Sequence, residues 1–136
     1  AAHILWYMGK DEEARQAASA ALFRLNGMRA DQGDDYRIDL AVAQARTLQG
    51  AEEDEVIEMV ERSRASKPND DLDAFRFHYL YASIFASAGM TKHAIEQLEP
   101  LQMPPSEVSR AVLELDPAFD RVREIPEFRA FLEQLQ

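Results

Sequence analysis

The fold is decided by residues 74–101, which read AFRFHYLYASIFASAGMTKHAIEQLEPL. Apolar side chains recur there at steps of three and four residues on both sides of Gly89, and this spacing is typical of two helices that each bury one face. Gly89 gives the backbone freedom that a helix end needs, and Thr91 is the expected N-cap of the second helix. Ala82 and Ala94 are small enough to let the two helices approach closely. The sequence therefore predicts a helical hairpin.

Composition extends this prediction to the rest of the chain. Alternating runs of Val, Ile and Thr are absent, whereas Ala, Leu, Glu and Gln are common, and there are only 5 Gly and 6 Pro residues. This composition is typical of an all-α protein. The length of 136 residues suits a single domain with a core of its own.

Charge and cysteine content narrow the classes of function. The formal net charge is −10, which would repel backbone phosphates and therefore argues against a nucleic-acid partner. A basic peptide partner is compatible with this charge, although an acidic surface by itself also keeps a domain soluble. The chain has no cysteine, which excludes disulfides, thiolate zinc sites and a cysteine nucleophile. No apolar run approaches the ~20 residues of a membrane span, so we expect no membrane contact by this segment.

The first half of the chain is divided by glycine and proline. We expect helices over residues 1–8, 10–26 and 35–49 and a fourth between Gly50 and Pro68, with the first three ending at Gly9, Asn26-Gly27 and Gly50. Residues 28–34 are expected to form a polar turn, and Asp70 or Asp71 to cap the hairpin. The fourth helix should face inward through Val56, Ile57 and Val60.

The last third of the chain is more irregular. Residues 102–105 contain two prolines and predict a break, after which Ser106 is expected to cap a short helix. That helix should point these residues inward: Val108, Ala111, Val112 and Leu115. Asp116-Pro117 fits an N-cap followed by proline at the first helical position. A final helix over residues 126–135 should bury Phe128, Phe131, Leu132 and Leu135.

A repeat relates the helical pairs to one another. Gly9 and Gly89 are each followed by Ala five residues on, and Gly50 begins a third copy, with glycine spacings of 41 and 39 residues. This pattern resembles the tetratricopeptide repeat (TPR) family, in lengthened form, because the family's standard unit has 34 residues. The positions that carry the resemblance are Gly9, Gly50 and Gly89, Ala14 and Ala94, Ala82, Ala21, Ser63 and Pro68.

The C-terminal segment carries a second resemblance. It is similar to the end of TPR regions in large bacterial regulatory proteins such as Ser/Thr kinases, nucleotide cyclases and winged-helix regulators. The matching residues are Asp116, Pro117, Phe119, Pro126, Phe128 and Leu132. Together the resemblances imply an α-α superhelix of antiparallel helix pairs over residues 1–103, with units at about 1–27, 35–68 and 70–101. Residues 104–136 would be a capping segment of the same domain.

Nothing in the sequence has the pattern of a catalytic or cofactor site. His93 and Glu96 share a helix face, and Asp70, Asp71, Asp73 and His78 could add metal ligands, but this spacing fits helix caps and surface residues better than a metal site. There is no nucleophile elbow and no phosphate-binding glycine loop. We therefore expect no enzyme activity, no metal and no cofactor.

The TPR resemblance implies a peptide-binding groove lined by the first helix of each pair. The positions that it assigns to the groove are His3, Trp6, Tyr7, Tyr36, Asp39, Arg46, Arg76, Tyr79, Ser83 and Ser87. Aromatic, arginine and aspartate side chains are suited to holding a peptide. Alternatively, Trp6 and Tyr7 pack against an upstream repeat or within the core, and packing is the favoured role of Tyr79.

Two hypotheses of function follow. In the first, the chain is the C-terminal TPR-like part of a larger bacterial protein and binds a protein or peptide partner without catalysis; the chain begins Ala1-Ala2 without Met, which agrees with an excised segment. In the second, it is a sensory or self-association segment that forms a homodimer, or docks on a neighbouring domain, through its first apolar helix. We expect a cytoplasmic location, or a periplasmic one if a membrane span precedes the chain.

Overall fold

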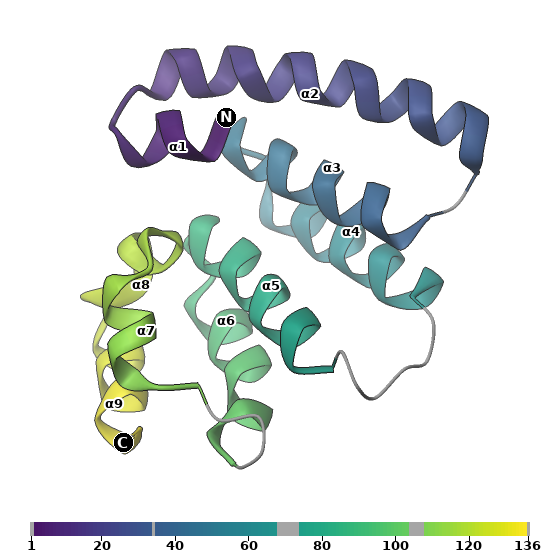
Figure 1. Ribbon diagram of the computed structural model, residues 1–136. Helices are drawn as coiled ribbons and strands as arrows, with labels where there is room; N and C mark the ends of the chain where they lie inside the picture. The colour runs from purple at the N-terminus through teal and green to yellow at the C-terminus, as the bar shows by residue number, and fades with distance from the viewer. Residues whose placement is uncertain (1, 34, 68–73, 104–107, 136) are drawn as a thin grey trace. The chain divides into compact units, whose positions relative to one another are not determined.

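The computed structural model describes residues 2–33, 35–67, 74–103 and 108–135 (Figure 1). Every regular element in these ranges is helical, which confirms the all-α prediction. The elements are α1 (Ala2–Tyr7), α2 (Asp11–Gln32), α3 (Tyr36–Leu48), α4 (Glu53–Ser66), α5 (Ala74–Ser87), α6 (Thr91–Leu98), η2 (Glu99–Gln102), α7 (Arg110–Leu115), η3 (Pro117–Phe119), α8 (Asp120–Arg123) and α9 (Pro126–Gln134). Contacts between residues divide the chain into two compact units, unit 1 over residues 1–69 and unit 2 over residues 70–136.

Unit 1 consists of α1 to α4, each packed on the next (Figure 1). Ala18 of α2 and Ala45 and Leu48 of α3 form a buried cluster, and Trp6 of α1 packs against it. Val56 and Val60 of α4 are completely buried, as their spacing predicted, whereas Ile57 beside them is only partly covered. The apolar stripes of α1, α2 and α3 therefore meet in one cluster, and α4 packs on α3.

The boundary predicted after Asn26 is wrong. Helix α2 continues without interruption to Gln32, so residues 28–32 of the expected turn are helical, and the helix ends at Gly33 with φ +73°. Gly27 is not among the glycines with positive φ, and it costs the helix only about 1 kcal/mol relative to alanine. Arg29, one turn before the end, forms an ion pair with Asp39 of α3. Tertiary contact with α3 thus outweighs the local preference of Asn26-Gly27 to end a helix.

Unit 2 contains the predicted hairpin. Helices α5 and α6 pack along one another, with Gly89 between them at φ +78°. Ala82 and Ala94 are completely buried, which confirms their expected role at the close contact. Thr91 is not the N-cap: it is the first residue of α6, and the N-cap position is held by Met90, whose side chain is buried instead of capping. Burial of the methionine stabilises this end in place of a hydroxyl hydrogen bond.

Residues 108–135 pack on the hairpin. Elements η3 and α8 contact α5, and α9 contacts α6. Phe119 and Phe128 are completely buried with their ring centroids 5.7 Å apart. Asp116 caps η3 by accepting a hydrogen bond from the Ala118 backbone N–H at 2.9 Å, as Asp116-Pro117 predicted. Phe131 and Leu132 of α9 are also buried, whereas Leu135 follows the helix and is partly exposed.

The inward face predicted for the short helix is wrong. Helix α7 begins only at Arg110, and Ser109 is its N-cap, accepting a hydrogen bond from the Val112 N–H at 3.4 Å. Val108 is buried but precedes the helix, where its N–H donates to Leu101 O at 2.8 Å. Leu113, which the prediction did not include, is buried in the helix, and of the four predicted residues only Val108 is buried. Ala111, Val112 and Leu115 are exposed.

Three groups of predictions fall outside the described residues. They concern the helix end at Pro68, the caps and metal ligands assigned to Asp70, Asp71 and Asp73, and the break and cap at residues 104–106. The regular TPR-like superhelix and its division into units remain predictions.

Candidate functional site

The ten residues predicted to line a groove are distributed over both units. His3, Trp6, Tyr7, Tyr36, Asp39 and Arg46 lie in unit 1, and Arg76, Tyr79, Ser83 and Ser87 lie in unit 2. Each unit is a compact body of its own, so the ten residues do not belong to one unit.

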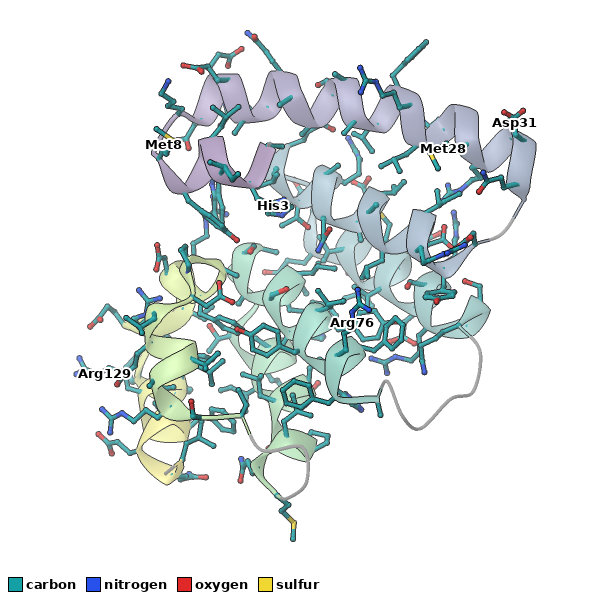
Figure 2. All side chains as sticks on the ribbon, in the orientation of Figure 1. His3, Met8, Met28, Asp31, Arg76 and Arg129 are labelled. Carbon is teal, nitrogen blue, oxygen red and sulfur yellow. The ribbon has the colours of Figure 1, made fainter. Side chains whose placement is uncertain are left out.

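An apolar groove, about 410 Å³ in volume, opens along α2 in unit 1. Its walls come from the start of α1, from one side of α2 and from α3. We call it the α2 groove, and its lining residues are Ala2, His3, Ala21, Arg24, Leu25, Met28, Ala41, Gln44, Ala45 and Leu48. Figure 2 shows His3 and Met28 on the side of α2 where α1 and α3 lie.

The lengths of the helices explain why this groove is open. Helix α1 has 6 residues and α2 has 22, so α1 can cover only part of its partner. Helix α2 packs on both α1 and α3. Leu25 is only partly buried and Met28 is 43% exposed.

Two predicted groove residues border the α2 groove. His3 contributes to its lining, and burial lowers the pKa of this imidazole below its ordinary value of 6.5, which favours the neutral ring at pH 7. Trp6 is partly buried and packs on the Ala18–Ala45–Leu48 cluster, which includes two lining residues. Tyr7 is 42% exposed and stacks at a tilt on Trp6 with a centroid distance of 5.4 Å.

A second pocket of unit 1, about 450 Å³ in volume, lies among α2, α3 and α4 and contains Asp39 and Arg46. Arg46 bridges α3 to α4, with its Nε donating to Glu55 Oε1 at 2.7 Å, and its Nη1 donates to Gln49 Oε1 at 2.9 Å. Asp39, 2% exposed, pairs with Arg29 and accepts a hydrogen bond from Ser66 Oγ at 3.3 Å. These charged groups already satisfy one another. These interactions hold α2, α3 and α4 together, and the charges of Asp39 and Arg46 are already paired.

Most of the remaining predicted residues form hydrogen bonds that join elements of their own unit. The backbone carbonyl of Tyr36 accepts a hydrogen bond from Ser63 Oγ at 3.1 Å, which ties α3 to α4. Tyr79 Oη donates to Asp116 Oδ2 at 2.5 Å, and Ser87 Oγ donates to Ala118 O at 3.3 Å, so both fix the C-terminal segment to α5. Ser83 Oγ donates to Leu80 O within its own helix, and Arg76 is exposed near the start of α5 (Figure 2).

The histidines of unit 2 are used in local contacts. His93 lies against Phe85 with a centroid distance of 5.1 Å, and His78 Nδ1 is 3.4 Å from Gln97 Oε1. Within the described ranges, no group of three or more His, Cys, Asp or Glu side chains is arranged to hold a metal ion. A search of the same residues for a helix able to cross a membrane finds none.

Most residues of the α2 groove escaped the sequence prediction. Met28 lies beyond the predicted helix end at Asn26-Gly27, whereas Arg24 and Leu25 lie inside the predicted helix and are not among the predicted groove positions. A usable signal was present, because Ala21, Leu25 and Met28 continue one apolar stripe through Gly27 at steps of four and three.

Comparison with known proteins identifies no relative of the chain: no protein-family model, no curated protein and no solved structure matches it.

Proposed function

We propose that the protein is a non-catalytic protein-interaction module, a TPR-like part of a larger bacterial protein, and that the α2 groove receives a helical segment of a protein partner. The observation that carries this proposal is the open groove itself, which is about 410 Å³ in volume and lined mainly by apolar side chains. This volume lies within the ~300–1,000 Å³ of typical binding pockets.

The lining suits an apolar helix face. Ala21, Ala41 and Ala45 have short side chains, so a partner backbone can come close to the groove. Leu25 and Met28 add larger, flexible apolar side chains to its lining. Methionine adapts to partners of differing shape because it is unbranched. Amphipathic helices commonly bind such grooves through apolar side chains spaced at three and four residues.

Selection of helical peptides displayed on phage tests this proposal, with the full chain as the target. Peptides selected against it should bind Met28→Glu at least about tenfold more weakly, because a carboxylate in an apolar groove must be desolvated when a peptide covers it. Phe23→Glu is the matched control: Phe23 is on the same helix, is 83% exposed and does not line the groove. If the two variants bind the selected peptides equally well, the α2 groove is not the binding site.

A second candidate function, self-association through α1, is favoured by a different observation. Ile4 of α1 and Met8, which directly follows α1, are 63% and 64% exposed. Exposed apolar side chains gathered on one element often mark an interface. Sedimentation of the full chain over a dilution series should then show a dimer that Ile4→Lys dissociates, and a monomer at every concentration rejects this candidate.

A further inference from the structure

A separate apolar hollow lies in unit 2, between α6 and the start of α9. It has a volume of about 580 Å³, and its apolar part is formed by Ile95 and Ile125. Around them stand Lys92, Glu96, Glu99 and Glu127. We call it the α6–α9 hollow.

The exposure of the isoleucine at the edge of this hollow is imposed by the backbone. Ile125 is the N-cap residue of α9 and is 38% exposed. Its N–H donates to Val122 O at 2.9 Å, and its carbonyl accepts from the Arg129 N–H at 3.0 Å. Pro126 follows at the first helical position, where its ring fixes φ. Because the chain is held on both sides, the apolar side chain cannot turn inward without breaking the start of α9.

The rim of the hollow has an excess of negative charge. It contains three carboxylates and one ammonium group. The nearest approach of Lys92 Nζ to Glu96 Oε1 is 3.9 Å, and these side chains are 86% and 49% exposed, so this pair is weak. Glu99 and Glu127 form no ion pair with any residue in the described parts of unit 2. Two rim carboxylates are thus available to a partner.

From this juxtaposition we infer that the α6–α9 hollow binds a basic protein segment that inserts one aliphatic side chain between Ile95 and Ile125 and places Lys or Arg beside the rim glutamates. The inference rests on the proposed function as an interaction module and gives it a second, chemically distinct surface. Charge complementarity selects this partner: acidic groups flanking an apolar floor favour a cationic amphipathic segment. A second copy of the chain is disfavoured because each copy has a net charge of −10.

A fluorescent peptide with Leu and Lys at helical spacing is the probe, titrated against the full chain by anisotropy. Replacing Glu96, Glu99 and Glu127 together by Gln should weaken binding by about tenfold or more. The matched control replaces Glu52, Glu53 and Glu61 by Gln, which changes the net charge equally at exposed positions of unit 1. The control should weaken binding by about twofold at most, since it alters only the long-range field.

One further variant separates a docked segment from diffuse attraction. Ile125→Ser should weaken binding by about fivefold with all charges kept, because an apolar contact is lost. The helical circular dichroism signal of each variant verifies folding. Equal losses in the rim and control variants, or no loss in Ile125→Ser, would overturn the inference.

Binding of the Leu–Lys peptide at the α6–α9 hollow should not depend on the α2 groove. Met28→Glu, which disables that groove, should bind the Leu–Lys peptide as the unaltered chain does. Failure of the hollow to bind leaves the phage-selected peptides and their loss in Met28→Glu unaffected.

Discussion

At the scale of single residues, the two partners of the Arg29–Asp39 ion pair differ in burial, so replacing one should cost more stability than replacing the other. The Asp39 side chain is 2% exposed and that of Arg29 is 29% exposed. Arg29→Met should lower the free energy of unfolding by about 3–5 kcal/mol because it leaves a buried carboxylate without its cation. Asp39→Asn should cost less, about 1–2 kcal/mol, since the guanidinium can reach water and the amide keeps an oxygen for Ser66.

Urea unfolding of both variants measures this asymmetry. Arg62→Met is the control, because its pair with Glu58 is 51% and 71% exposed and should contribute less than about 1 kcal/mol. Equal destabilisation by Arg29→Met and Arg62→Met would contradict a special cost of leaving the Asp39 carboxylate without its cation.

Asp35, the N-cap of α3, should make the stability of the protein depend on pH. Hydrogen bonds from the side chain and the backbone of Arg37 lower the pKa of Asp35 from 3.8 to about 2. Because the folded-state pKa is the lower one, the stabilisation is complete above pH 3.8 and is lost as the pH falls toward 2. Asp35→Asn keeps a capping oxygen but no titrating carboxyl, so its urea midpoint should fall less than that of the unaltered chain between pH 5 and pH 2.5.

Asp31→Asn removes an equal charge from an exposed site in the last turn of α2 and serves as the control. A pH dependence that Asp35→Asn and Asp31→Asn change to the same extent would mean that general charge, and not the cap, is responsible.

At the scale of elements, two glycines with the same surroundings should respond in opposite ways to alanine. An added Cβ at either Gly27 or Gly89 would meet no atom within 4 Å, so only the backbone differs. Gly89 has φ +78°, where alanine is strained by about 1–2 kcal/mol. Gly27 lies inside α2, where alanine is the better helix former by about 1 kcal/mol.

Gly89→Ala should therefore lower the melting temperature and Gly27→Ala should raise it, as measured by circular dichroism. A destabilising Gly27→Ala would show that this position is the end of a helix, as its sequence Asn26-Gly27 alone suggests.

At the scale of the whole molecule, the close contact at Ala82 decides how unit 2 holds together. Ala82 is completely buried in α5, which contacts α6, η2, η3 and α8. Ala82→Trp overfills this contact and should lower the free energy of unfolding by about 3 kcal/mol or more. Hydrogen exchange read residue by residue should show faster exchange throughout the helices of unit 2.

Ala20→Trp is the control for the size of the added side chain, because Ala20 is exposed on α2. An unchanged exchange rate in α5 and α6 of Ala82→Trp would contradict close packing there.

The sequence by itself determined the all-α class, the α5–α6 hairpin, the end of α1 at Gly9 and the Asp116-Pro117 cap. Each depends on local physics: the 3.6-residue period, the positive φ of glycine and the fixed φ of proline. What only the tertiary structure decided were the end of α2, the inward face of α7 and the uses of Asp39, Tyr79 and Ser87. These depend on partners distant in sequence, Arg29 on Asp39 and the C-terminal segment on α5, whose burial outweighs local preferences of about 1 kcal/mol. The α2 groove belongs to the second class, because it arises from the unequal lengths of two helices that pack together.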